Sequence, residues 1–388
     1  MIHAILPFRK SFMFSVLLWI VLSLLAPGLL LAGNASGNNG QGHQGFRIEA
    51  QRWTEAEKIF RSDPHWLGGD GATSVDLGNG RVLWLFGDSF IDPSSSGVRR
   101  ATDLVRNSIA IQTGYDPTKA AMAFFWKTKD LKPAAFFQRN GDHWFWPASG
   151  IMVGKRLIIF LMEIHPADNE LGFDAWGWKA VLIENPHEPP NLWSLTYLIS
   201  PQKNNLVVGS GNPIIENGFL QVFAADGRDR SVYLVRWPER FARAGTLTRP
   251  QWWAGDKAGW MDVQAAGSKP CRIITEGQME FTVECAPQLE CYIQVQTLSI
   301  VNPCLAMASA PNLTGHWSSQ ECFFTPTEQG LKDMMIYAGK SHPTLIGAEM
   351  VFTYVVNTIK EKMLLEDMSI YFPIMLKGQI TADNIRPR

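Results

Sequence analysis

Short β-rich runs separated by Gly, Pro, Asn and Asp fill most of the chain beyond residue 80, and long helical periodicity is scarce. This pattern is typical of an all-β fold. The clear runs are RVLWLFGDSF (81–90), SIAIQT (108–113), GIMVGKRLIIFLMEI (150–164), FLQVFAA (219–225), SVYLVRW (231–237), EFTVECA (280–286), CYIQVQTL (291–298), DMMIYAGKSH (333–342) and MVFTYVVNT (350–358). Tight turns such as Glu216-Asn217-Gly218 join several of them, which predicts antiparallel hairpins.

A small or polar motif recurs at the entrance of five β-runs, at intervals of about 60 to 80 residues, which suits a four-stranded propeller blade with long connections. The motifs are Gly68-Gly69-Asp70, Trp146-Pro147-Ala148-Ser149-Gly150, Gly209-Ser210-Gly211-Asn212-Pro213, Gln278-Met279-Glu280 and Lys340-Ser341-His342-Pro343. The sequence therefore predicts a single five-bladed β-propeller over residues 46–388, with the motifs around one funnel. A β-sandwich with long loops is the alternative. The run SIYFPIML near the C-terminus is expected to supply a closing strand.

The first 35 residues have the pattern of a targeting segment. Arg9 and Lys10 precede an apolar run from residue 11 to residue 32, and small residues follow it. The run suits a cleaved signal peptide, but it is also long enough to be an uncleaved inner-membrane anchor. Residues 36–45 form a Gly/Asn-rich flexible linker. The globular part is expected to be exported, either to the periplasm or out of the cell.

The charge and the aromatic content of the chain indicate which kinds of ligand it could bind. The formal net charge is −1 and there is no basic excess, which argues against nucleic acid as a partner. The chain has 15 Trp and 22 Phe, which pack in cores or line carbohydrate-binding grooves. No phosphate-loop, dinucleotide or zinc-binding spacing is present, so neither a cofactor nor a metal is expected. The chain has five cysteines, which in an oxidising compartment could form at most two disulfides and would leave one free thiol. They are Cys271, Cys285, Cys291, Cys304 and Cys322.

The hairpin GGDGATSVDLGNGRVLWLFGDSFID holds an aspartate on each arm. A turn centred on Asn79 places Asp70 opposite Asp88, on the same face of the sheet. Two like charges at that spacing are unfavourable, and partial shielding would leave one carboxyl protonated and the other ionised. Acid/base hydrolysis of a glycosidic bond needs such a pair. The alternative is that both aspartates cap backbone amides in turns.

The motif GGDGA…LWLFGDSF, followed by RNSIAI, resembles a family of bacterial exported five-bladed propellers long described as a domain of unknown function. Some members of that family are glycoside hydrolases, including endo-D-arabinanases. The later stretches WPASGIMVGKRLIIF, MEFTVECAPQLECYIQVQT and IYAGKSHPTL…FTYVVNT resemble its successive blades. The resemblance implies that Asp70 and Asp88 are the acid/base pair. The chain departs from the expected pattern at Ser149 and Asn212, which occupy positions where a further carboxylate would assist catalysis.

Six further residues are candidates for supporting the pair or binding substrate: Arg106, Asn107, Trp144, Trp146, Glu280 and His342. Arg106 is expected to hold one carboxylate ionised, or else to form a surface ion pair. Glu280 would be a third carboxylate in the funnel, or a solvent-facing strand residue. His342 would orient substrate or tune a neighbouring carboxyl, or be a buried structural histidine.

Three of these candidates would contact the sugar itself. Asn107 would hydrogen-bond a hydroxyl, or else satisfy a strand end. Trp144 and Trp146 flank the second motif and would form a stacking platform, with core packing as the alternative.

Together these features predict an exported glycoside hydrolase acting on a polysaccharide, such as the furanoside arabinan. A non-catalytic carbohydrate-binding or scaffold propeller of the cell envelope is the competing prediction. A serine esterase is a distant third, because Ser149 lacks the G-x-S-x-G elbow.

Overall fold

The computed structural model describes residues 46–382, apart from 170–171, 202–205, 263–268 and 300–301. The targeting segment 1–35 and the linker 36–45 therefore lie outside the described residues. Within the described part of the chain, no helix is long and apolar enough to cross a membrane. The fold is all-β, as predicted, and the helices of the described residues are short segments between strands.

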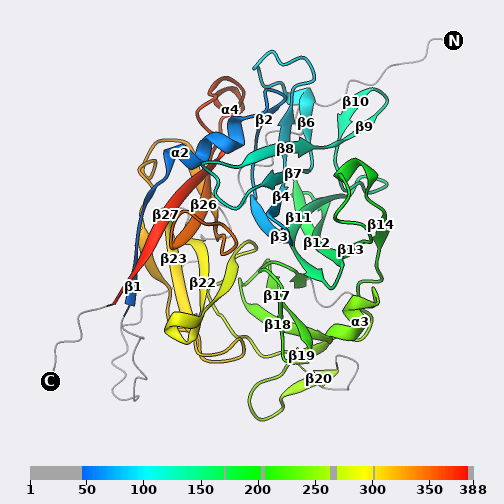
Figure 1. Ribbon diagram of the computed structural model, residues 1–388, viewed down its shortest axis with the longest axis vertical. Coiled ribbons are helices and arrows are strands. Elements are labelled where there is room, and N and C mark those ends of the chain that lie inside the picture. Colours follow the sequence, from blue (N-terminus) through cyan, green and yellow to red (C-terminus); the bar gives the residue numbers. More distant parts are fainter. Residues whose placement is uncertain (1–45, 170–171, 202–205, 263–268, 300–301, 383–388) are drawn as a thin grey trace.

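Five antiparallel sheets of at least four strands follow one another around the molecule (Figure 1). The first contains β3 (Thr73–Gly78), β4 (Arg81–Phe86), β7 (Ser108–Thr113) and β8 (Ala121–Phe125). The second contains β11 (Trp144–Val153), β12 (Arg156–Pro166), β13 (Phe173–Ile183) and β14 (Leu195–Tyr197). The third contains β15 (Leu206–Val208), β16 (Ile214–Glu216), β17 (Phe219–Asp226), β18 (Val232–Pro238), β19 (Gln251–Trp253) and β20 (Trp260–Asp262).

The fourth sheet contains β21 (Thr282–Ala286), β22 (Cys291–Leu298), β23 (Cys304–Ala310) and β24 (Glu321–Phe324). The fifth contains β25 (Met334–Ser341), β26 (Met350–Thr358), β27 (Pro373–Ala382) and β1 (Phe46–Arg52). The remaining strands are β2 (Trp66–Gly69), β5 (Ser89–Ile91), β6 (Leu104–Val105), β9 (Lys127–Lys129) and β10 (Lys132–Ala134). The α-helices are α2 (Thr54–Glu57), α3 (Glu239–Arg243) and α4 (Glu361–Glu366).

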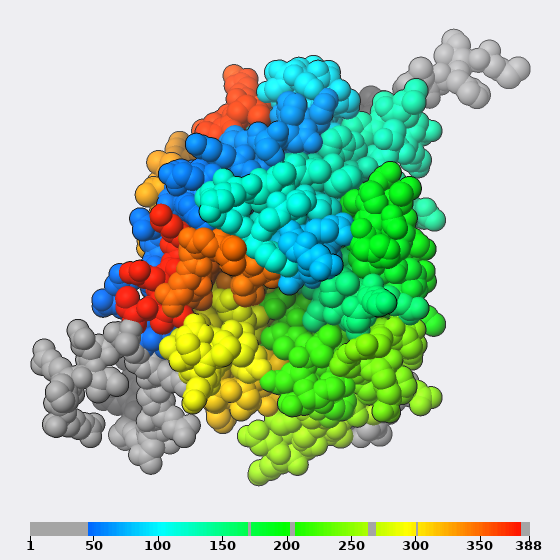
Figure 2. Space-filling view, viewed as in Figure 1, coloured from blue at the N-terminus to red at the C-terminus, as the bar shows by residue number. Residues whose placement is uncertain are grey.

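The two ends of the described chain share the fifth sheet. Strand β1 pairs with β27 along seven residues, from Phe46 opposite Ala382 to Arg52 opposite Leu376. Figure 2 shows the two segments, blue and red, side by side at one edge of the molecule. The predicted closing strand is therefore present, since β27 begins within the run SIYFPIML. Hydrogen bonds between the chain ends hold the ring of sheets closed.

Apolar side chains fill the spaces between neighbouring sheets. The central strand β4 is apolar on both faces, and five of its six residues are fully buried. Eight tryptophans are buried, as expected for residues that pack in a core: Trp53, Trp66, Trp84, Trp144, Trp178, Trp193, Trp237 and Trp252. Among the described cysteines, one disulfide joins Cys304 on β23 to Cys322 on β24, and the other three cysteines are free.

A buried arginine fixes the segment that leads into β27. The Arg99 side chain is 3% exposed and donates four hydrogen bonds, all to backbone carbonyl oxygens, at 2.7–3.0 Å. The acceptors belong to Leu67, Leu364, Asp367 and Ile370. Arg99 therefore ties strand β2, which leads into the Asp70 arm of the hairpin, to the chain between α4 and β27.

Candidate active site

The hairpin places Asp70 and Asp88 opposite each other, as its sequence predicts. Thr73 pairs with Leu85 on one side of the two aspartates, and Gly69 pairs with Ser89 on the other. The Gly87 amide donates to the Asp70 carbonyl oxygen at 2.9 Å. A Cβ at Gly87 would lie 2.4 Å from Asp70 Oδ1, so glycine is needed beside the pair.

The register of this hairpin depends on its turn and on a bulge beside the turn. Gly78, Asn79 and Gly80 all have positive φ angles, of 75°, 54° and 75°, a conformation that glycine and asparagine adopt readily. Gly78 pairs with Arg81 beside the turn, and a bulge between Asp76 and Gly78 then shifts the pairing by one residue, so that Asp76 lies opposite Val82. The shifted register continues into β2 and β5. The aspartates lie at the break between these two pairs of strands, where their side chains are free to face a cavity.

Both carboxyls line a pocket of about 280 Å³, to which all five sheets or the segments leading into them contribute. The first, second and fourth of the five predicted entrance motifs line it, through Asp70, Trp146 and Glu280. The other two motifs do not line it. In the third and fifth sheets the pocket is formed instead by the end of β17 and by β25, at Asp226 and Tyr337.

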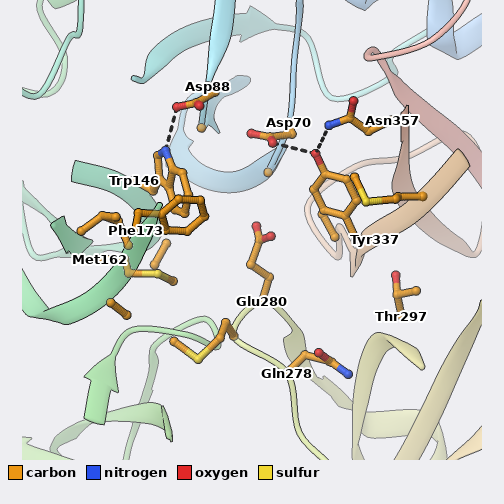
Figure 3. Close-up of a pocket in the computed structure, with 18 of the residues that line it drawn as sticks. Asp70, Asp88, Trp146, Met162, Phe173, Gln278, Glu280, Thr297, Tyr337 and Asn357 are labelled. Atoms are coloured by element: carbon orange, nitrogen blue, oxygen red, sulfur yellow. Dashed lines mark hydrogen bonds between the residues drawn. The ribbon is translucent and has the colours of Figure 1, made fainter. Parts of the chain in front are cut away.

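Two donors hold the Asp88 carboxylate. Arg106 Nη1 lies 3.0 Å from Oδ2. The indole Nε1–H of Trp146 donates to Oδ1 at 2.8 Å, as Figure 3 shows. The Arg106 guanidinium in turn lies 4.3 Å above the Trp144 ring. The pKa of Asp88 is raised overall because burial outweighs Arg106 and Trp146, which both favour the ionised carboxylate. Arg106 therefore lies where it was predicted to stabilise the ionised form of one aspartate.

Asp70 has a different environment. Its Oδ2 accepts a hydrogen bond from the Tyr337 hydroxyl at 2.7 Å, and the Tyr371 hydroxyl lies 3.3 Å away. No cation contacts this carboxyl among the described residues. Burial, together with the charges of Asp88 and Glu280, raises the pKa of Asp70 to about 8. Asp70 is therefore protonated at neutral pH.

The third carboxyl, Glu280, is held by a buried lysine. Lys340 Nζ lies 2.6 Å from Glu280 Oε1 and also donates to the Gly71 carbonyl oxygen, and its side chain is 1% exposed. Three carboxyls, Asp70, Asp88 and Glu280, thus lie together in the pocket, with two cations in contact with them. Arg106 pairs with Asp88 and Lys340 pairs with Glu280, which leaves Asp70 as the one of the three without a cation in contact.

Asn107 and His342 do not reach the pocket, which corrects their predicted contacts with substrate. The Asn107 amide is fully buried and bonds the backbone of Phe137 and Phe145. His342 lies between the hydroxyls of Ser74 and Thr353, each at 2.8 Å. Burial lowers the pKa of His342 to about 3, so its ring is neutral. Both residues connect strands of the core.

The two tryptophans have separate roles. Trp146 lines the pocket and binds Asp88, whereas Trp144 is not a lining residue and packs against Arg106. Their rings meet edge to face, at an interplanar angle of 70°, so they form no continuous flat platform. Of the two predicted stacking residues, Trp144 is therefore a core residue, and only Trp146 lies where it could contact a sugar.

Sequence reasoning missed the residues that surround Asp70: Lys340, Tyr337, Tyr371 and Asn357. Lys340 belongs to the fifth entrance motif, in which His342 was chosen as the candidate. A lysine inside a β-run that is otherwise apolar was the available signal, since a buried lysine needs a carboxylate partner. Tyr371 precedes the closing strand, and its sequence context gives no such signal.

Replacing Asp70 by asparagine is expected to stabilise the fold at alkaline pH. The folded state binds the Asp70 proton more tightly than the unfolded state, in which an aspartate has a pKa near 3.9. The free energy of unfolding of the wild type therefore falls as the pH rises from about 4 to about 8. We expect Asp70→Asn to be more stable by about 3 to 5 kcal/mol at pH 9, with little difference at pH 4. Urea unfolding at both pH values measures this, and a pH-independent difference would contradict it.

Lys340→Met is expected to raise the pKa of Asp70 further, because the lysine cation favours the ionised carboxylate. The alkaline limb of any activity that requires protonated Asp70 should move upward by about one pH unit. The pH dependence of kcat/KM measures the shift. Lys360→Met, on an exposed lysine, is the matched control and should leave the limb in place. An unmoved limb in Lys340→Met would contradict the role of Lys340.

The sequence family described as "Domain of unknown function (DUF5005)" matches residues 54–388. The chain belongs to this family. The match agrees with the resemblance that the hairpin and the later motifs indicated. No curated protein sequence matches the chain.

Among solved structures, the chain is similar to a proposed hydrolase from Bacteroides ovatus, with a TM-score of 0.70 and 14% identity over 88% of this chain and 93% of that one. The two proteins share a fold. The catalytic domain of a GH62 α-L-arabinofuranosidase from Coprinopsis cinerea has a TM-score of 0.47 and 10% identity, over 87% of this chain and 98% of that one. An endo-arabinase from Bacteroides thetaiotaomicron has a TM-score of 0.41 and 11% identity, over 82% and 95%.

Proposed function

We propose that the protein is an exported glycoside hydrolase that cleaves a polysaccharide in the central pocket of a five-bladed β-propeller. Each of the five sheets would be one blade. The observation that carries the proposal is the pair of facing carboxyls with opposite environments. Asp88 has a guanidinium and an indole N–H as partners, whereas Asp70 is buried beside two other carboxyls and has no cation of its own.

The two environments assign the roles. Asp70, protonated at neutral pH, acts as the general acid and gives its proton to the glycosidic oxygen as the carbon–oxygen bond breaks. Asp88, as the ionised carboxylate, either removes a proton from the attacking water as general base or attacks the anomeric carbon itself as nucleophile. Arg106 and Trp146 keep that carboxylate in place through its two oxygens. Tyr337 orients Asp70 and is itself held by the Asn357 amide at 2.9 Å.

The sequence supports the choice of substrate and the location. The resemblance of the blade motifs to exported propellers that include endo-D-arabinanases makes arabinan the first polysaccharide to test. The apolar N-terminal run supports export to the periplasm or the medium, or attachment to the inner membrane.

Turnover on polysaccharides tests the proposal. The full-length protein is incubated with arabinan, arabinogalactan, xylan and bacterial envelope polysaccharides. New reducing ends are then measured, beside a binding isotherm for each polymer. We expect reducing ends to accumulate with time on at least one polymer. Saturable binding without any new reducing ends would instead identify a carbohydrate-binding propeller.

A further inference from the structure

The pocket has two chemically different sides (Figure 3). On one side lie the hydrogen-bonding groups of Asp70, Glu280, Tyr337 and Asn357, although Met335, from the same strand as Tyr337, also lines the pocket. On the other side, below Asp88, an apolar wall is formed by side chains from β11, β12, β13 and the segment before β21. The wall residues are Trp146, Met162, Ile164, Phe173, Ala175 and Met279.

The apolar wall is one continuous surface. Its six residues belong to the same hydrophobic cluster, and Trp146 and Phe173 meet edge to face at 5.0 Å. Met162 and Ile164 are nearly buried beneath it, whereas Phe173 and Met279 are only partly buried and present their carbon and sulfur atoms to the cavity. The wall is therefore accessible from the pocket.

Hydrogen-bonding capacity along this wall is low. Two polar side chains lie along it. The indole N–H of Trp146 donates to Asp88, and Asp174, between Phe173 and Ala175, accepts a hydrogen bond from the Ala175 amide at 2.8 Å. The carboxylate from the third sheet, Asp226, is paired with Arg228 at 2.9 Å. A sugar hydroxyl placed against the carbon and sulfur atoms of the wall would lose its hydrogen bonds to water without replacement.

We propose that the pocket binds a glycoside that carries an apolar substituent, an acyl or alkyl group, with that substituent against the apolar wall and the sugar against the polar side. This inference rests on the proposed function, because it takes the pocket to be a glycoside site. Methionine suits such a role, since its unbranched thioether adapts to the shape of a linear chain. The carboxyl pair lies at the boundary between the two sides, where the sugar meets its substituent.

A homologous series of ligands tests the inference without requiring turnover. The full-length protein is titrated calorimetrically with methyl, butyl, hexyl and octyl β-glucosides below their micelle concentrations. Affinity is expected to rise about threefold to fourfold for each methylene that the wall covers. Equal affinity for the methyl and octyl compounds would overturn the inference. So would n-octanol binding as tightly as octyl glucoside, because the polar side would then contribute nothing.

Variants of the wall residues test whether the alkyl chain binds there. Met279→Gln and Phe173→Gln, each on a partly exposed residue, should reduce the gain in affinity for each added methylene. Met152→Gln, on a partly buried methionine at the far end of β11, is the matched control and should keep it. A dependence unchanged in both wall variants would overturn the inference. Absence of hydrolysis on every glycan, with the chain-length dependence intact, would count against the proposed function alone.

Discussion

Asp88→Asn is expected to lower glycoside hydrolysis roughly a thousandfold, whichever substrate is used. Asparagine keeps the size of the side chain and one acceptor oxygen for Trp146 or Arg106. It removes the negative charge that takes a proton from water or attacks the anomeric carbon. Because this charge is needed with every leaving group, a more reactive glycoside should not restore the rate. Comparing kcat/KM for a polysaccharide and an aryl glycoside measures this.

Asp70→Asn gives the contrasting result that separates the two roles. The general acid matters most when the leaving group is a poor one, so hydrolysis of the polysaccharide should fall as steeply as in Asp88→Asn. Hydrolysis of an aryl glycoside should fall far less, since a phenolate leaves without a proton. Asp174→Asn alters another aspartate that lines the pocket and is the control. If the two asparagine variants respond alike to the leaving group, the assignment of acid and base is wrong.

Arg99→Met is expected to lower the free energy of unfolding by about 3 to 5 kcal/mol. Methionine fills much of the volume but leaves four carbonyl oxygens without the donor that satisfies them. These carbonyls belong to the two segments that Arg99 joins, so the chain between α4 and β27 should also loosen. Urea unfolding, with the slope compared between variants, measures the loss.

Arg100→Met is the control for this change, since Arg100 is exposed and adjacent in sequence. It should alter the free energy of unfolding by less than about 0.5 kcal/mol. A loss below about 1 kcal/mol in Arg99→Met would show that water replaces the guanidinium at the four carbonyls. The claim that Arg99 fixes the chain before β27 would then be wrong.

The placement of the aspartate pair could be predicted because its physical causes are local. A Gly-Asn-Gly turn and a one-residue bulge beside it set the register of one hairpin, and that register puts residue 70 opposite residue 88. The burial of β4 follows equally from its apolar run, which leaves no face for water. The recurrence of β-runs and entrance motifs likewise predicted an all-β fold closed by strands from both ends of the chain.

Residues whose position depends on packing between sheets could not be placed in this way. Asn107 immediately follows Arg106, yet its amide is bound by the backbone of Phe137 and Phe145, which come from another part of the chain. His342 and Lys340 share one motif, but Lys340 lies inside β25 and contacts Glu280, whereas His342 lies beyond the end of β25 and contacts Ser74 and Thr353. These partners come from other sheets or strands, and the spacing within the motif does not indicate them.

The most direct test of the central claim is reducing-end release by the wild type and by the double variant Asp70→Asn/Asp88→Asn, on the same panel of polysaccharides. Circular dichroism would confirm that both proteins are folded. The account predicts release by the wild type on at least one polymer, and none above background by the double variant. Equal release by the two proteins, or none by the wild type on any polymer, would contradict it.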